Sequence, residues 1–448
     1  MGNTLETTFI SKEMTRRNFI RFAALSSAGF LAGCATDPVT GRSQLMLVSE
    51  EQEIQIDREN SPHQFSADYG TIQDHALNAY IGSTGKRMAA QTHRTNMPYS
   101  FRAVNATYMN AYAFPGGSIA CTRGMLLALE NEAELAGLLG HELGHVNARH
   151  TAEQTSKGML ISATVGGLAT YAGSQSQILG SIAQGLAGIG AGALLAKYSR
   201  DNEREADALG MEYMVKSGYN PNGMVGLMDI LRNMSMQKPA ALELMFATHP
   251  MSEERYRTVL QATRTKYRTA ERFPVLRTRY MDHTASLRKM KGAIDEMQKG
   301  EKEMGKGRFP SARNHFRQAL YKAPDDYAGL LMMAKCLYVQ KKFTEAIPYT
   351  NLAKQVYPKE PQAYLVSGMA SLQQKKYHAG YRDFHTYQQL LPGNPNITFL
   401  QGYSLEGMGD TQPAANQYHR YLQSVSSGNQ AQYAYQRLVQ WGYITPAR

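Results

Sequence analysis

Residues 132–145 read EAELAGLLGHELGH, and this stretch decides how the first half of the chain folds. Acidic residues open it and apolar residues recur at helical spacing, so the pattern predicts a helix. His141 and His145 lie one turn apart on one face, where both imidazoles can reach the same metal ion. Glu142 lies about 100° round the helix from His141, where it can accept a proton from an attacking water. The motif therefore predicts one catalytic Zn²⁺ per chain, with Glu142 as the general base.

A catalytic zinc takes three protein ligands and keeps a fourth position open. Glu203 and Asp207 lie one turn apart on a second amphipathic pattern and share a face. We predict Glu203 as the third ligand and Asp207 as the acceptor that orients a ligand imidazole. Glu205 would point about 200° away from Glu203, so the two glutamates cannot both bind the metal. On an ideal helix His150 is about 180° from His141, and we exclude it as a ligand for that reason.

Short strands precede the motif helix. Apolar runs at 99–104, 111–114 and 119–121 are separated by asparagine, proline and glycine, which end strands and favour turns. Long helical patterns follow them. The sequence therefore predicts an α+β domain that is mainly helical and contains a small sheet.

The last third of the chain repeats with a period of 34 residues. Four turns keep this spacing: Gly307-Arg308-Phe309, Lys341-Lys342-Phe343, Lys375-Lys376-Tyr377 and Gly409-Asp410-Thr411. Small residues and prolines recur in the same register: Ala334, Gly368 and Gly402, and Pro324, Pro358 and Pro392. This pattern is typical of tetratricopeptide repeats, in which helix pairs stack to bury their apolar faces. An all-α superhelix is therefore expected after the first domain.

Together these motifs resemble the zincin-like gluzincin metallopeptidases, the family of HtpX and the CAAX-prenyl endopeptidases. Ser199 and Arg200, just before Glu203, match this family, and so does the segment 110–117, NAYAFPGG. The resemblance spans about residues 37–260, and with the repeats the chain is most similar to the periplasmic BepA-like branch. No membrane spans are evident, which argues against a prenylated substrate.

The resemblance also implies roles for residues outside the zinc motif. It implies that Asn110, Ala111 and Ala113 bind the substrate as an added β-strand. His249, in Thr-His-Pro, and Arg255 match family positions, and we predict that both act in catalysis. In relatives the histidine lies near the zinc and acts as an extra, inhibitory ligand. The alternative is a histidine in an ordinary loop.

The N-terminus has the features of an export signal. Arg16-Arg17 precede an apolar stretch at 22–32 that is too short to span a membrane as a mature helix. The arginine pair resembles a twin-arginine signal, and the sequence Leu-Ala-Gly before Cys34 resembles a bacterial lipobox. This implies that residues 1–33 are a signal peptide and that Cys34 is lipidated. An ordinary secretory signal with a chance cysteine is the alternative.

The predicted anchor sets the expected location. Ala35 follows Cys34, and by resemblance to enterobacterial sorting this favours the periplasmic side of the outer membrane. The soluble periplasm is the alternative. Met14 lies two residues before the arginine pair and is a second candidate start.

The chain is basic, and its charge is uneven. Residues 1–254 hold 19 Lys+Arg and 24 Asp+Glu, a net −5, while residues 255–448 hold 29 and 13, a net +16. The basic half suits acidic partners or anionic membrane, or it is a set of solvated helix faces. No nucleic-acid signature is present, so we expect no nucleic-acid partner. Residues 158–196 are rich in Gly, Ala, Ile and Leu, and polar residues interrupt them; we expect two helices beside the site rather than a membrane hairpin.

These observations predict a division into a peptidase domain at 34–270, a helical linker at 271–290 and repeats at 291–448. The expected function is that of a membrane-anchored zinc endopeptidase that hydrolyses envelope or misfolded proteins in outer-membrane quality control. The repeats would bind envelope or outer-membrane assembly proteins. The alternative is a chaperone or assembly factor that acts through the repeats and rarely uses its peptidase site. Whether Cys121 and Cys336 pair stays open at this stage.

Overall fold

The computed structural model describes residues 34–36, 38–39, 41, 43–154, 197–237, 245 and 248–445. The predicted signal peptide and the segment 158–196 lie outside these residues. Within them, no helix is both long enough and apolar enough to cross a lipid bilayer. The strands are β1 (Cys34–Thr36), β2 (Ser43–Leu45), β3 (Ser100–Val104), β4 (Ala111–Ala113) and β5 (Ser118–Thr122).

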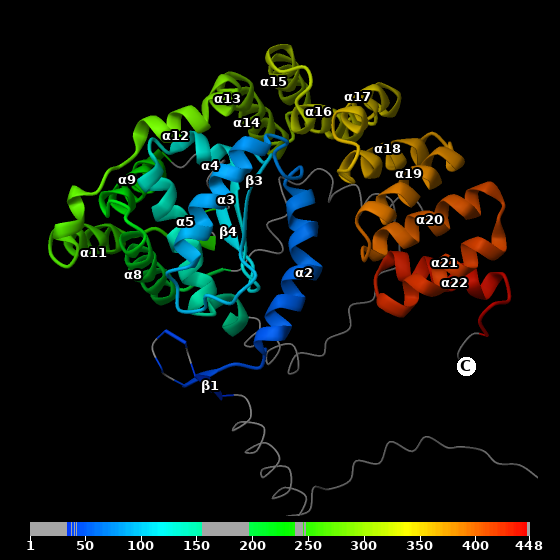
Figure 1. Cartoon of the computed structure of the whole chain (residues 1–448). Coiled ribbons are helices and arrows are strands. Elements are labelled where there is room, and N and C mark those ends of the chain that lie inside the picture. The colour runs from blue at the N-terminus through cyan, green and yellow to red at the C-terminus, as the bar shows by residue number, and fades with distance from the viewer. Residues whose placement is uncertain are drawn as a thin grey trace, which may run out of the picture.

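Helices make up most of the described chain, in two groups (Figure 1). The first group surrounds the sheet: α2 (Glu50–Ala67), α3 (His75–Ala89), α4 (Arg123–Ala128), α5 (Glu132–Asn147), α8 (Arg200–Lys216), α9 (Asn222–Gln237), α11 (Glu253–Arg264), η3 (Arg268–Arg272), α12 (Arg277–His283) and α13 (Ala285–Lys289). The second group forms an arc: α14 (Lys291–Gly305), α15 (Phe309–Lys322), α16 (Tyr327–Val339), α17 (Phe343–Val356), α18 (Gln362–Gln373), α19 (Tyr377–Leu390), α20 (Pro395–Met408), α21 (Thr411–Ser424) and α22 (Asn429–Gln440). The predicted fold class, α+β followed by all-α repeats, is confirmed.

The small sheet has the strand order β3-β5-β4, with β3 parallel and β4 antiparallel to β5. Strand β4 therefore lies at an edge. Side chains alternate across a strand, and Ala111 and Ala113 of β4 join the core that contains α5, while Tyr112 joins a separate cluster with Phe65 of α2. The sheet thus lies between α5 and α2. Strand β4, which pairs only with β5 among the described strands, runs beside the motif helix.

Helices α5 and α8 approach each other closely because small residues line their contact. A Cβ atom on Gly140 would lie 2.8 Å from the carbonyl oxygen of Gly210, and one on Gly144 would lie 2.7 Å from that of Ala206. Larger side chains at these positions would push the helices apart. The close contact places His141 on α5 beside Glu203 and Asp207 in the first half of α8.

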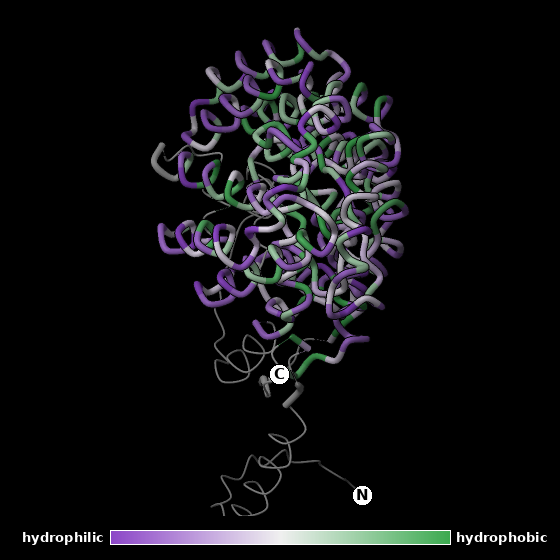
Figure 2. The backbone as a smooth tube through the Cα atoms, turned by 60° about the vertical axis from the view of Figure 1, so that its left-hand side comes forward, coloured by the Kyte–Doolittle hydropathy of each residue, from purple (hydrophilic) through white to green (hydrophobic). Residues whose placement is uncertain are grey.

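The arc consists of tetratricopeptide repeats, as the 34-residue period predicts. Each repeat turns at the same register position, where Gly307, Lys341, Lys375 and Gly409 have φ of 72°, 59°, 57° and 87°. This left-handed conformation suits glycine and ends a helix sharply. In three repeats an aromatic ring packs on the small residue of the preceding helix: Phe316 on Gly300, Phe384 on Gly368 and Tyr418 on Gly402. Figure 2 shows hydrophilic and hydrophobic residues alternating along the coils of the helices, as expected where each helix buries one face.

The segment predicted as a linker packs against the first core. Tyr280 of α12 is fully buried, and its hydroxyl donates to the carbonyl oxygen of Leu126 at 2.6 Å. Leu287 of α13 is 5% exposed and belongs to the same core. The predicted domain boundaries stay a prediction. The segment 271–290, predicted as a linker, packs on the core of the peptidase part.

A buried ion pair joins the two groups of helices. Arg123, at the start of α4, donates from Nη1 and Nη2 to Asp326 at 2.6 and 3.1 Å, and both side chains are almost fully buried. Asp326 also caps α16 by accepting from the backbone N–H of Gly329 at 2.8 Å. Cys121 and Cys336 are both buried free thiols, so no disulfide joins these groups. The junction therefore includes a buried pair of matched charges.

We predict that Asp326→Ala lowers the free energy of unfolding by about 3–5 kcal/mol, because it leaves the Arg123 guanidinium buried without its partner. Urea unfolding of the purified chain measures this loss. Glu345→Ala is the matched control, since its pair with Arg313 is 2.8 Å long but largely exposed and contributes about 0–1 kcal/mol. Equal losses in the two variants would contradict the structural role of the buried pair.

Candidate metal centre

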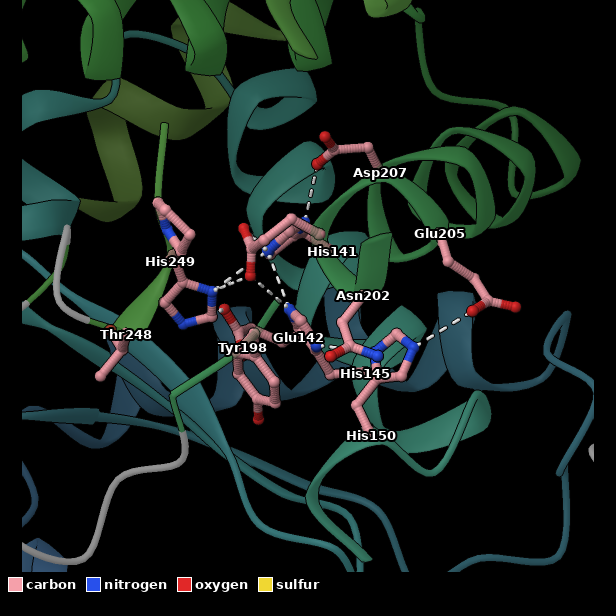
Figure 3. Close-up of polar contacts among 12 residues, drawn as sticks. His141, Glu142, His145, His150, Tyr198, Asn202, Glu205, Asp207, Thr248 and His249 are labelled. Atoms are coloured by element: carbon pink, nitrogen blue, oxygen red, sulfur yellow. Dashed lines mark hydrogen bonds and ion pairs between the residues drawn. The ribbon is translucent and has the colours of Figure 1, made fainter. Parts of the chain in front are cut away.

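Four side chains direct donor atoms to one point between α5, α8 and the segment before α11. They are His141, His145, Glu203 and His249, and their donor atoms all lie within 4.8 Å of one another. All four residues are at most 5% exposed. Figure 3 shows the three imidazoles facing one another, with His249 approaching from its own segment. Three donors are thus held on helices, and the fourth comes from a loop.

The donor atoms have the spacing that a tetrahedral metal site requires. Nε2 of His141 and Nε2 of His145 are 3.1 Å apart, and Nδ1 of His249 is 3.3 Å from the former. Glu203 Oε1 lies 3.0 Å from Nδ1 of His249 and 3.3 Å from Nε2 of His145. Ligand bonds of about 2.0–2.1 Å in a tetrahedron place neighbouring donors about 3.3 Å apart. The residues present therefore fit a zinc ion.

Protonation states also suit a metal. Burial lowers the pKa of His145 well below its usual value, so this imidazole is neutral. Burial alone would raise the pKa of Glu203, but its interactions with His249, His141 and His145 outweigh burial and hold that pKa well below the usual range. Neutral imidazole and ionised carboxylate are the forms that bind a metal.

Asp207 and Arg255 support the donors from behind. Oδ1 of Asp207 lies 2.9 Å from Nδ1 of His141, on the side away from the other donors (Figure 3). Arg255, on α11, donates from Nε and Nη2 to the two oxygens of Asp207 at 2.7 Å each, and its Nη1 lies 2.5 Å from Oε2 of Glu203. Arg255 therefore fixes two carboxylates at once. Its predicted catalytic role stays a prediction.

His150 lies close to the site although it is not among the four donors. Helix α5 ends at Asn147, so the ideal helical angle does not apply to His150. Its Nδ1 lies 2.9 Å from Nδ1 of His145, and its Nε2 lies 3.2 Å from Glu205 Oε2. His150 and Glu205 thus orient the second imidazole, a role that the sequence did not reveal.

Tyr198 is a second residue that the sequence did not reveal. Its ring stacks on the imidazole of His145, with centroids 3.7 Å apart and planes 19° apart. Its backbone N–H donates to the carbonyl oxygen of Thr248, next to His249. Tyr198 therefore links the start of α8 to the loop that carries the fourth donor.

Glu142 lies beside the donor group and does not join it. Its side chain is almost fully buried, and Oε2 has no hydrogen-bond partner among the residues that the structure describes. Burial raises the pKa of this carboxyl above its usual value. Oε1 lies 3.9 Å from Nε2 of His249. A buried carboxylate with a free oxygen beside a metal site can accept a proton.

Asn110 has unsatisfied hydrogen-bonding groups next to the edge strand. It is fully buried, and neither its amide nitrogen nor its amide oxygen is bonded within the described part of the chain. Its backbone pairs with Thr122 at the end of β5. Ala111 and Ala113 follow on β4, where their small side chains face the core with α5. The three predicted substrate-binding residues are therefore contiguous at one sheet edge.

Comparison with known proteins agrees with this geometry. Residues 75–263 match the family described as Peptidase family M48. Over these residues the chain is similar to the peptidases of family M48. Residues 303–368 match the tetratricopeptide repeat. The predicted resemblance is confirmed, and the chain is a metallopeptidase.

Curated relatives match this chain over different shares of its length. The beta-barrel assembly-enhancing protease of Yersinia pestis is 26% identical over 88% of this chain and 85% of its own length. The protein of the same name from Escherichia coli (strain K12) is 27% identical over 50% of this chain and 47% of its own length. Metalloprotease YcaL of that organism is 33% identical over 38% of this chain and 66% of its own length. The chain thus spans most of the first relative and about half of the second.

We predict that Asp207→Asn weakens zinc binding about 10- to 100-fold, because the amide no longer holds the His141 ring as a carboxylate does. Competition with a chromogenic chelator measures the affinity. Glu212→Gln is the matched control on the same helix, since Glu212 pairs with exposed Lys216 and is not among the donors of the metal centre, so the variant should not alter the affinity. A wild-type zinc affinity in the Asp207→Asn variant would show that Asp207 does not support metal binding.

Proposed function

We propose that the M48 domain of this chain is a zinc-dependent endopeptidase. The observation that carries the proposal is the convergence of His141, His145 and Glu203 beside Glu142, whose Oε2 has no hydrogen-bond partner in the described part of the chain. Zinc, when bound there, would supply positive charge that polarises the scissile carbonyl. No other cofactor is needed for the hydrolysis of a peptide bond.

Glu142 would move the proton during the reaction. Its free Oε2 would take a proton from the attacking water and pass it to the leaving amine. His141 and His145 keep their orientation through Asp207 and His150, so Glu142 faces a fixed centre. The burial of these residues excludes bulk water and strengthens electrostatic effects.

The edge of β4 would hold the substrate in an extended conformation. The main chain of a bound peptide would add a strand beside β4 (Ala111–Ala113), at the edge that runs next to α5. The amide of Asn110, fully buried and without a hydrogen-bond partner among the described residues, lies just before this strand and would bond to the peptide only if the edge opened to admit it. Such binding depends on hydrogen bonds to the main chain of the substrate and little on its sequence. This suits an enzyme that acts on unfolded protein segments.

We further propose that the substrates are envelope proteins and that the role is outer-membrane protein quality control. Two relatives share the name beta-barrel assembly-enhancing protease, and this supports the proposal. The repeats would bind envelope or outer-membrane assembly proteins. A lipid on Cys34 would hold the chain at the periplasmic side of the outer membrane, and about 0.8 kcal/mol per buried methylene makes a multiply acylated cysteine a stable anchor.

A chaperone or assembly factor is the second candidate. The repeats form a large helical surface, and His249 is the fourth donor of the metal group. A site closed in this way would rarely cleave, and the repeats would then do most of the work. The two candidates differ in whether the physiological effect needs Glu142.

We predict that the Glu142→Gln variant still binds zinc. Its peptidase activity should fall by about two to four orders of magnitude, because the group that accepts the proton is gone. Cleavage of casein by the zinc-loaded variant measures the loss, and its zinc content is checked in parallel. Undiminished casein cleavage by this variant would contradict the role of Glu142 as the proton acceptor. Full complementation of a deletion strain by the inactive variant would favour the chaperone.

His249 would regulate the site. A neutral imidazole in the fourth position makes a closed tetrahedron of the structural kind and leaves no place for water. Nδ1 of His249 is close enough to Glu203 and His141 to fill that position. A substrate held on the repeats would draw the loop away, so the activity would depend on two states of the loop.

We predict that His249→Ala raises basal casein cleavage and self-cleavage, up to about tenfold for a bias of about 1.4 kcal/mol towards the closed state. Zinc binding should persist, because three ligands remain. Gel analysis of self-cleavage measures the rate, with a Glu142→Gln variant as the blank. Equal rates would make His249 a bystander, and lost activity would make it a positive catalytic group.

A further inference from the structure

The edge strand is held from behind by a buried carboxylate on α2. Tyr112, the central residue of β4, donates from its hydroxyl to Oδ2 of Asp68 at 2.5 Å. Asp68 is fully buried and also accepts from Tyr108 at 2.7 Å and from Gln64 at 2.9 Å. Ala111 and Ala113 face the other side of the sheet. The position of β4 relative to α5 therefore depends on where Asp68 lies.

Asp68 is the C-terminal cap of α2, and this end of α2 contacts the repeats. Ser66 donates from its hydroxyl to Oε1 of Glu360 at 2.6 Å, just before α18. Tyr69 belongs to the core of the repeats, and Nζ of Lys335 on α16 lies 4.8 Å from the centre of its ring. Asp68 lies between these two contact residues in the sequence.

The backbone at this point is strained. Tyr69 has φ of 65°, which a tyrosine adopts only where its surroundings hold it. Asn105, just after β3, donates from its side-chain amide to the carbonyl oxygen of Tyr69 at 3.0 Å. The repeats and the sheet therefore fix this short segment from both sides.

Helix α2 holds the β4–β5 hairpin at a second point. Oδ2 of Asp57 accepts from the backbone N–H of Ser118, the first residue of β5, at 2.8 Å. Asp57 and Asp68 thus tie both strands of the hairpin to α2 and its C-terminal cap. In Figure 1 this helix stands between the sheet and the repeats.

We propose that Asp68 and Tyr112 are positioning residues that set the substrate-binding edge of β4, and that the repeats hold Asp68 in place through Ser66 and Tyr69. This inference rests on the proposed function. The repeats then act on substrate binding in the peptidase site, in addition to any partner that they recruit. The occupant of the edge is an extended segment of an unfolded protein.

The test is steady-state cleavage of fluorescein-labelled casein by the full-length, zinc-loaded chain. Tyr112→Phe keeps the ring and loses the hydrogen bond to a charged group, so KM should rise about three- to tenfold. The turnover number, the zinc content and the thermal midpoint should stay near their wild-type values. Tyr418→Phe is the matched control, because it removes a hydroxyl bond to another carboxylate, that of Glu406 at 2.6 Å, on a helix of the repeats that does not touch Asp68, and its KM should change less than about twofold.

The contribution of the repeats is tested with Ser66→Ala. This variant should raise KM, and its effect should shrink when Tyr112→Phe is also present, because both act through Asp68. Independent, multiplying effects would overturn the link to the repeats. An unchanged KM in Tyr112→Phe, or an equal rise in Tyr418→Phe, would overturn the positioning role.

Failure of the proposed function gives a different result. Glu142→Gln serves as the blank for every assay. A wild-type chain no faster than this blank would overturn the proposed function, and this inference with it. Cleavage above the blank with an unchanged KM would overturn this inference alone.

Discussion

The contact between α5 and α8 is the constraint on which the site depends. Gly140 meets Gly210, and Gly144 meets Ala206, at distances where no larger side chain fits without moving a backbone. Each helix carries part of the donor group on the face that this contact brings together. Metal ligands must lie within a few tenths of an ångström of their places, so the spacing between the helices sets the centre.

The rest of the peptidase part holds that helix pair in place. Glu132, at the start of α5, accepts from Tyr80, Tyr219 and Arg279 on three other elements. At the other end Arg94 donates to the carbonyl oxygen of Val146. The motif helix is therefore fixed at both ends by buried polar contacts. Such contacts are costly to leave incomplete, which favours a single arrangement of the helix.

Local periodicity made much of this predictable. Helical spacing placed His141 and His145 on one face and separated Glu203 from Glu205, and the 34-residue period identified the repeats. Ideal helical geometry also excluded His150 as a ligand, but it could not show that α5 ends before this residue and turns it towards His145. The contacts of Arg255, the stacking of Tyr198 and the Tyr112–Asp68 bond join elements that are distant in sequence. No repeating pattern marks such contacts, so they emerge only from the tertiary fold.

The way the donors are held has a consequence for assembly. His141, His145 and Glu203 are placed by a hydrocarbon core and by helix packing, and each belongs to an element that is complete without an ion. In small zinc domains the ion is the core, and binding and folding are one event. Here the helices that carry the ligands pack on a hydrocarbon core of their own. Chelation should therefore empty the centre without unfolding it, and acquisition of the ion becomes a separate step that can follow folding.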